Sequence, residues 1–123
     1  MPLAYNRDLI LTTTIAKTLE TDGHVITSKW VLDEDPSWGL SYAQLSKRDF
    51  DALGDSDALV AEISSPSHGV GMEIQYAVMN NKVIVCLRRQ DSRISGLIAG
   101  NKKILVLTYS DNEDVARMLR GKL

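Results

Sequence analysis

The feature that most constrains the fold is an apolar run that leads through a Ser/Pro/Gly turn into a helix, over residues 57–77. Residues 58–63 are mostly apolar, which is typical of a parallel strand covered on both faces. Ser and Pro residues interrupt this run, and Gly69 and Gly71 follow, where the backbone turns tightly or approaches a ligand. Apolar residues then recur at helical spacing. The N–H groups that begin such a helix point over the carboxyl end of the strand, where open α/β sheets bind ligands and phosphate.

Glu73 lies near the start of this predicted helix, and two interpretations of it remain open. An acidic residue in a first turn can simply interact with the helix dipole, which stabilises a helix by about 0.3–1 kcal/mol. Alternatively, the glycine turn holds this carboxylate at a ligand cleft, as a nucleophile or general base. The spacing alone does not decide between them.

Two elements are predicted before a long loop. A helix over residues 6–22 has Asn6 as a candidate cap, Asp8 in its first turn and Gly23 after its end. In residues 24–30, successive side chains fall into two alternating sets that would point to opposite faces of a strand. This alternation predicts a strand.

The loop over residues 31–40 contains Trp38, which we expect either to stack on a flat ligand or to cap the core. A helix over residues 41–53 follows, and Gly54 closes it. Asp49 is on the face of this helix that is expected to pack on the sheet. An acid there is either functional or half-turned toward solvent.

Beyond the central stretch, apolar runs at 82–87 and 103–109 predict two more buried strands. Short helices are expected over 95–99 and 111–119. Alternation of strands and helices predicts an α/β fold with a parallel sheet and right-handed crossovers. With 123 residues, the chain (1–123) is expected to form one domain.

The composition narrows the classes of function. A net charge of −2 gives no electrostatic footprint for nucleic acid, and no apolar run approaches the roughly 20 residues that span a bilayer. The N-terminus does not resemble a signal peptide. Cys86, the single cysteine, reads as a buried thiol that fits a reducing compartment such as the cytoplasm or nucleus. The two histidines and this cysteine are too far apart in sequence to predict a metal site.

Three segments together carry a family resemblance: Asp49, the block VAEISSPSHGVGMEIQYAV (60–78) and KVIVCL (82–87). They resemble the 2′-deoxynucleoside 5′-phosphate N-hydrolases, within the nucleoside 2-deoxyribosyltransferase-like group. The likeness extends from about residue 9 to 109 and is weak before residue 27. It implies a three-layer Rossmann- or flavodoxin-like parallel sheet with helices on both faces.

The resemblance also implies roles for individual residues. Glu73 matches the glutamate that attacks the anomeric carbon, and Asp49 matches the acid that relays a proton to the departing base. Ser67, Gly69 and Gly71 match the phosphate cradle. Ser95 matches a serine that reaches the phosphate across a homodimer interface. The implied reaction releases a free base and 2-deoxyribose 5-phosphate, without a metal or cofactor.

The sequence departs from the family pattern at its start. Family members begin with a central strand and a G-S-I-R-G-G-type loop, whereas this sequence starts with MPLAYNRDL, and Tyr5 does not match the family tyrosine. We therefore expect a sheet without that strand, with the vacancy closed by rearrangement or by another subunit, and with weak or absent hydrolysis. Three functions stay open: the N-hydrolase, a nucleoside deoxyribosyltransferase, and a catalytically incomplete nucleotide-binding or dimerisation module.

Overall fold

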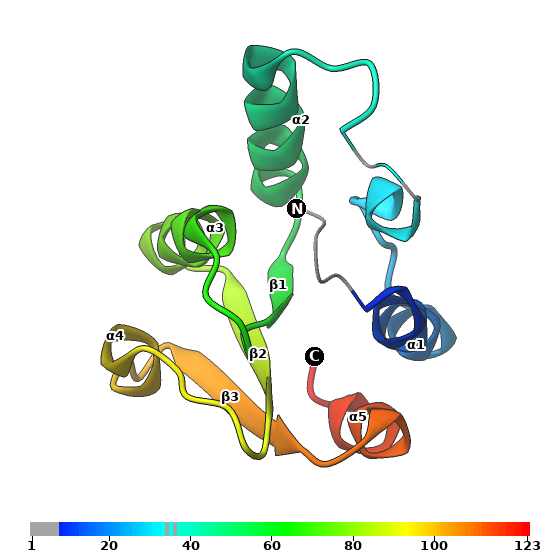
Figure 1. Ribbon diagram of the computed structural model, residues 1–123, viewed down its shortest axis with the longest axis vertical. Helices are drawn as coiled ribbons and strands as arrows, with labels where there is room; N and C mark the ends of the chain where they lie inside the picture. Colours follow the sequence, from blue (N-terminus) through cyan, green and yellow to red (C-terminus); the bar gives the residue numbers. More distant parts are fainter. Residues whose placement is uncertain (1–7, 34, 36) are drawn as a thin grey trace.

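Three parallel strands form the centre of the molecule, as the alternation of elements predicts (Figure 1). They are β1 (Ala58–Glu62), β2 (Val83–Arg89) and β3 (Ile104–Tyr109), and they hydrogen-bond in the order β1-β2-β3. Ala58 lies opposite Val83, and Ile84 lies opposite Ile104, so all three strands end at the same edge of the sheet. This computed structural model describes residues 8–33, 35 and 37–123.

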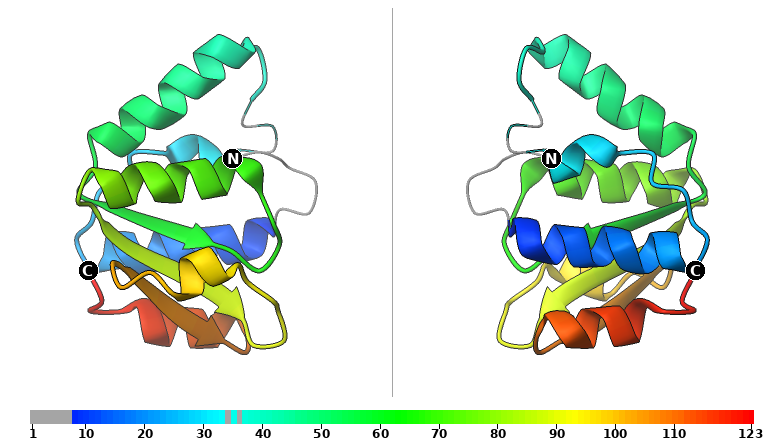
Figure 2. Two further views of the ribbon diagram at one scale, coloured as in Figure 1. Left: turned by 90° about the vertical axis from the view of Figure 1, so that its left-hand side faces the viewer. Right: turned by 90° about the vertical axis from the view of Figure 1, so that its right-hand side faces the viewer.

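Helices cover both faces of this sheet, which confirms the three-layer α/β architecture. One face carries α3 (His68–Met79) and α4 (Gly96–Ala99), and the other carries α1 (Leu9–Thr21) and α5 (Asn112–Leu119). The two views of Figure 2 show α4 in front of the sheet from one side and α1 in front from the other. A further helix, α2 (Tyr42–Gly54), packs beside α3.

The central strand β2 explains why both layers are needed. Ile84 and Cys86 belong to one buried cluster with residues of α2 and α3, whereas Val85 and Leu87 join the clusters formed with α1 and α5. All four side chains are buried. A strand that is apolar on both faces is stable only when both faces are covered, and the continuous apolar run at 82–87 predicted this.

Side-chain caps fix where the helices begin, because the first N–H groups of a helix have no partner within it. The side chains of Asp8, Ser67 and Asp111 accept hydrogen bonds from the backbone of α1, α3 and α5. Ser41 caps α2 through a capping box with Gln44. The predicted helix starts are thus confirmed to within a few residues, with Asp8 as the cap of α1, while Asn6 and Tyr5 lie outside the described residues.

The predicted strand over residues 24–30 is wrong. Its last residues begin the 3-10 helix η1 (Lys29–Leu32), and the residues before it form no ladder. The hydroxyl groups of Thr27 and Ser56 instead share a hydrogen bond of 2.8 Å. An alternating sequence becomes a strand only where another strand can pair with it, and β1 pairs with β2 alone among the described strands.

Other boundaries and exposures also differ from expectation. Gly54 is the last residue of α2 rather than the residue after it, and β2 continues to Arg89. The strands are not buried throughout, because Val83 at the start of the central strand β2 is 53% exposed and Leu105 of the outer strand β3 is 45% exposed. Trp38 is 81% exposed, so the expectation that it caps the core is wrong. The three described strands pair without a gap between them, so no vacancy lies inside this sheet.

Candidate functional site

The turn between β1 and α3 lies at the carboxyl edge of the sheet, and this turn and the first two turns of α3 contain four of the six predicted site residues: Ser67, Gly69, Gly71 and Glu73. The predicted strand, turn and helix are all present. Ser67 is the N-cap of α3, and its hydroxyl accepts a hydrogen bond of 3.2 Å from the backbone N–H of Val70. Residues 65–68 of this turn are exposed, so the start of α3 is open to solvent.

Glu73 lies on α3 and is half-buried. Burial raises the pKa of the Glu73 carboxyl above its ordinary value, because charge is costly away from water, and the negative charge of Asp49 raises it further. Asp49 comes from α2, the helix that packs beside α3. The structure therefore brings together the two carboxylates that the sequence singled out.

Asp49 is held by an ion pair that the sequence did not reveal. The Nε atom of Arg48 donates to the Oδ1 atom of Asp49 at 2.9 Å, and the two side chains are only 21% and 16% exposed. The guanidinium carbon of Arg48 also lies 4.2 Å from the ring centroid of Trp30, which is a cation–π contact. Trp30 thus supports Arg48, and Arg48 in turn orients Asp49.

The two predicted glycines occupy the first turn of α3. Gly69 is half-buried and Gly71 is exposed. A Cβ atom added to Gly71 would meet nothing within 4 Å, so packing within the chain does not require a glycine there. The space above this turn is open, and a ligand could approach the backbone closely at this position.

Ser95 is the predicted site residue that the structure does not join to the others. It is exposed and caps α4, with its hydroxyl accepting a hydrogen bond of 3.1 Å from the N–H of Leu97. In the described part of the chain, no hydrogen bond connects Ser95 to Ser67 or Glu73. Both α3 and α4 lie on the same face of the sheet, so the two regions share one side of the molecule (Figure 1).

A polar network joins the carboxyl ends of all three strands, and the sequence pattern did not predict it. Glu62, the last residue of β1, accepts hydrogen bonds from the backbone N–H of Ser64 at 2.8 Å, from its hydroxyl at 2.7 Å, and from the Tyr109 hydroxyl. The Ser64 hydroxyl accepts from the N–H of Arg89 at 2.7 Å. Burial, followed by the bond to Glu62, raises the pKa of Tyr109 to about 12. The phenol therefore remains a hydrogen-bond donor at neutral pH.

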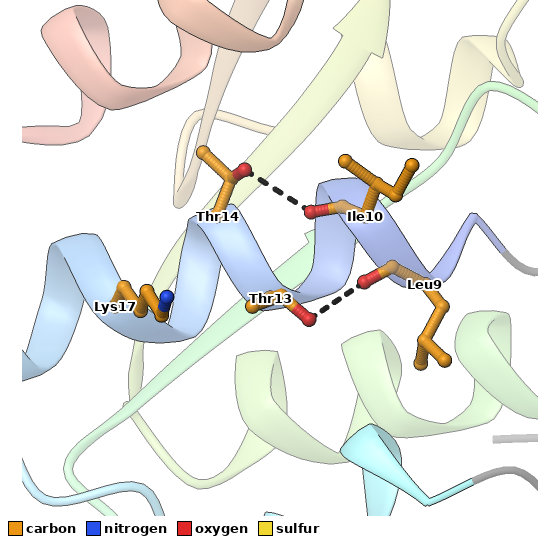
Figure 3. A pocket seen from close by; sticks show the side chains of 5 residues that line it. All are labelled: Leu9, Ile10, Thr13, Thr14 and Lys17. Carbon is orange, nitrogen blue, oxygen red and sulfur yellow. Dashed lines mark hydrogen bonds between the residues drawn. The ribbon is translucent and has the colours of Figure 1, made fainter.

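Two grooves on the surface lie away from these residues. One, of about 360 Å³, is on the outer side of α1 and is lined by Leu9, Ile10, Thr13, Thr14 and Lys17 (Figure 3). The hydroxyl groups of Thr13 and Thr14 in this groove are bonded to the backbone one turn earlier. The other, of about 510 Å³, includes Lys82, Lys102, Lys103 and Lys122 and adjoins the amino ends of β2 and β3. Neither groove contains Asp49 or Glu73.

Within 8–33, 35 and 37–123, no group of three or more His, Cys, Asp or Glu side chains is arranged to hold a metal ion. In the same residues, no helix has the length and apolar character that crossing a bilayer requires.

Comparison with known proteins gives a consistent set of relatives, although no family model matches the sequence. A protein of Thermofilum pendens is 32% identical over 115 residues, covering 89% of this chain and 80% of the relative. One of Methanococcoides burtonii is 33% identical over 100 residues, covering 79% and 77%. Both carry the name "putative 2′-deoxynucleoside 5′-phosphate N-hydrolase 1".

A vertebrate relative and a solved structure extend this comparison. The 5-hydroxymethyl-dUMP N-hydrolase of Danio rerio is 35% identical over 109 residues, covering 76% of this chain and 69% of the relative. The structure of a Clostridium botulinum CMP N-glycosidase superposes with a TM-score of 0.74, at 22% identity, covering 89% of this chain and 86% of that one. The structural likeness agrees with the three-layer fold. The sequence similarity shows more: the chain belongs to the 2′-deoxynucleoside 5′-phosphate N-hydrolase family.

Proposed function

We propose that this protein hydrolyses the N-glycosidic bond of 2′-deoxynucleoside 5′-monophosphates, giving a free base and 2-deoxyribose 5-phosphate. The observation that carries the proposal is the pairing of Glu73 with Asp49 beside an open helix start. Cleavage of a glycosidic bond passes through a transition state with positive charge on the sugar, which paired carboxylates stabilise. The names of the relatives support this reaction and this class of substrate.

In this proposal, the ionised Glu73 carboxylate attacks the anomeric carbon, and a water molecule later releases the sugar from it. Asp49 delivers a proton to the departing base, which lowers the energy of the leaving group. The raised pKa of Glu73 means that the empty site favours the protonated form of this residue more than an exposed glutamate does. Because the pKa is linked to the charge of Asp49, protonation of Asp49 would favour the ionised nucleophile.

The phosphate would bind at the start of α3. The hydroxyl of Ser67 and the backbone N–H of Gly69 can donate hydrogen bonds there, and the helix dipole favours negative charge. The N–H of Gly71 already donates to the carbonyl of Ser67 at 3.0 Å, so the part of Gly71 would be to leave room for the phosphate. No metal is needed for this contact. Residues 1–123 would act as one catalytic domain, and the buried Cys86 thiol, whose pKa burial raises to about 11, suits a reducing compartment such as the cytoplasm.

Ser95 would reach the phosphate of a second subunit in a homodimer. Its exposure supports this placement, as does the exposure of Leu97 on α4 and of Met72 on α3, which lies on the same face of the sheet, because a partner would cover apolar side chains there. Mixing two inactive variants tests the arrangement. Glu73→Gln and Ser95→Ala chains should regain activity when combined, since one site of each hybrid dimer is then intact. No gain on mixing, or a monomer by sedimentation, would remove this role.

The substrate assignment is tested by measuring kcat/KM for paired substrates. Deoxynucleoside monophosphates should be cleaved faster than the matching deoxynucleosides, because only the former use the phosphate site. Ribonucleotides should be poor substrates, since a 2′-hydroxyl would crowd Glu73. Equal values with and without the phosphate would instead favour a deoxyribosyltransferase, and binding of the monophosphate without base release would favour the nucleotide-binding module.

A further inference from the structure

The three strand ends are tied together by one set of hydrogen bonds, here called the strand-end clamp: Glu62, Ser64, Arg89 and Tyr109. The Glu62 carboxylate accepts from Ser64 and from Tyr109, which is only 2% exposed. Ser64 also accepts from the backbone of Arg89. The clamp therefore joins β1, β2 and β3 through side chains, in addition to the ladder between their backbones.

The packing of the core does not require the hydroxyl group of Tyr109. Its ring lies in an apolar cluster with Leu11, Leu87 and Val115, where a phenylalanine would fill nearly the same volume. A hydroxyl at such a depth is costly unless it is hydrogen-bonded, and here its partner is a carboxylate. The bond therefore fixes where Glu62 can lie.

Ser64 transmits this constraint to the turn that precedes α3. It is the second residue after β1, and it is held on one side by Glu62 and on the other by Arg89. The next residues, Ser65 and Pro66, are exposed and lead directly to Ser67, the cap of α3. The clamp thus holds the turn at one end, while the helix holds it at the other.

We propose that Glu62, Ser64 and Tyr109 are positioning residues that set the β1–α3 turn for binding the substrate phosphate. This inference rests on the proposed function for its substrate, but it concerns residues that need not touch the substrate themselves. Loosening the clamp should weaken contacts to the phosphate and leave the reaction at the sugar largely unchanged, because Glu73 lies a full turn further along α3.

The test compares Tyr109→Phe with Tyr76→Phe. Tyr76 is a matched control, because it is a half-buried tyrosine of α3 whose ring contacts Phe50 and which lies outside the clamp. Tyr109→Phe should raise KM for a deoxynucleoside monophosphate about fivefold or more, with kcat within about twofold and with unchanged kcat/KM for the deoxynucleoside. Tyr76→Phe should change none of these values. Equal losses for both substrates, or no change in Tyr109→Phe, would overturn the inference.

A second pair of variants separates positioning from a general loss of structure. Ser64→Ala should raise KM for the monophosphate in the same way, whereas Ser64→Thr, which keeps a hydroxyl, should restore it. Failure of threonine to restore KM while the chain remains folded would count against the clamp.

A direct titration with 2-deoxyribose 5-phosphate distinguishes this inference from the proposed reaction. Binding to the unmodified protein that Tyr109→Phe weakens would support the clamp even if no base is released, and in that case only the reaction would be wrong. If the unmodified protein releases base, and it and Tyr109→Phe bind 2-deoxyribose 5-phosphate equally well, then only the clamp is wrong. Absence of binding to the unmodified protein would overturn both.

Discussion

The carboxylates of Asp49 and Glu73, from two neighbouring helices, lie close enough that the charge of one raises the pKa of the other. Replacing Asp49 by Asn should therefore lower the pKa of Glu73, although burial will still keep it above the ordinary value of 4.5. An NMR titration of the Glu73 side-chain carboxyl measures this. Asp51→Asn is the control, since Asp51 is an exposed residue of the same helix that pairs with Lys47. An equal fall in both variants would contradict a direct interaction.

The same raised pKa predicts how Glu73 affects stability. A group whose pKa is raised on folding favours the folded state most below its unfolded pKa, and this contribution is lost as the pH rises through the folded value. Glu73→Gln should therefore stabilise the protein at neutral pH, and the gain should shrink as the pH falls through the folded pKa of Glu73 and be lost below about pH 4.5. Urea unfolding of both proteins from pH 3.5 to pH 7.5 tests this. A gain that is constant across that range would show that ionisation of Glu73 is not its cause.

The raised pKa of Tyr109 predicts how the stability of the protein changes at alkaline pH. Its folded pKa is about 12 against an ordinary value of 10.0, so its contribution to stability is complete below pH 10 and is lost between pH 10 and pH 12. Tyr109→Phe should lose less stability over this interval than the unmodified protein does. Comparing the two proteins cancels the titration of other groups. Parallel loss in both would mean that Tyr109 ionises equally easily in the folded and unfolded chains.

The elements that the sequence predicted correctly are those that are specified locally. The apolar run of β2 predicts a strand covered on both sides, and Ser67 followed by glycines predicts the start of α3. Pairing of strands is not local, and this explains the wrong strand at 24–30. Residues 24–30 do alternate, but Trp30 lies within a 3-10 helix and contacts Arg48 rather than a neighbouring strand.

The arrangement of the candidate site could be predicted only in part, for the same reason. Asp49 and Glu73 were proposed as site residues because they belong to a recognisable pattern of residue types. Arg48 and the bond between Glu62 and Tyr109 depend on contacts between elements far apart in the chain, and nothing in the residue spacing indicates them. Such contacts become visible only once the helices and strands are placed.

The ion pair between Arg48 and Asp49 predicts a loss of stability when it is broken. Arg48→Ala leaves the half-buried Asp49 without this bond and removes the contact with Trp30, so we expect unfolding to become easier by about 1–3 kcal/mol. Lys47→Ala is a matched control, because the neighbouring pair with Asp51 is exposed and should contribute little. Chemical denaturation measures both. A loss in Lys47→Ala as large as in Arg48→Ala would contradict this account.

Base release by Glu73→Gln tests the central claim most directly. The assay incubates each deoxynucleoside 5′-monophosphate with the unmodified protein, with Glu73→Gln, and with Gln75→Ala as a control at an exposed position of the same helix. A neutral amide can neither attack the sugar nor stabilise its positive charge, so Glu73→Gln should release base at least about 100-fold more slowly while its circular dichroism is unchanged. Gln75→Ala should retain full activity. Base release by Glu73→Gln at the rate of the unmodified protein would contradict the assignment of Glu73 as the nucleophile.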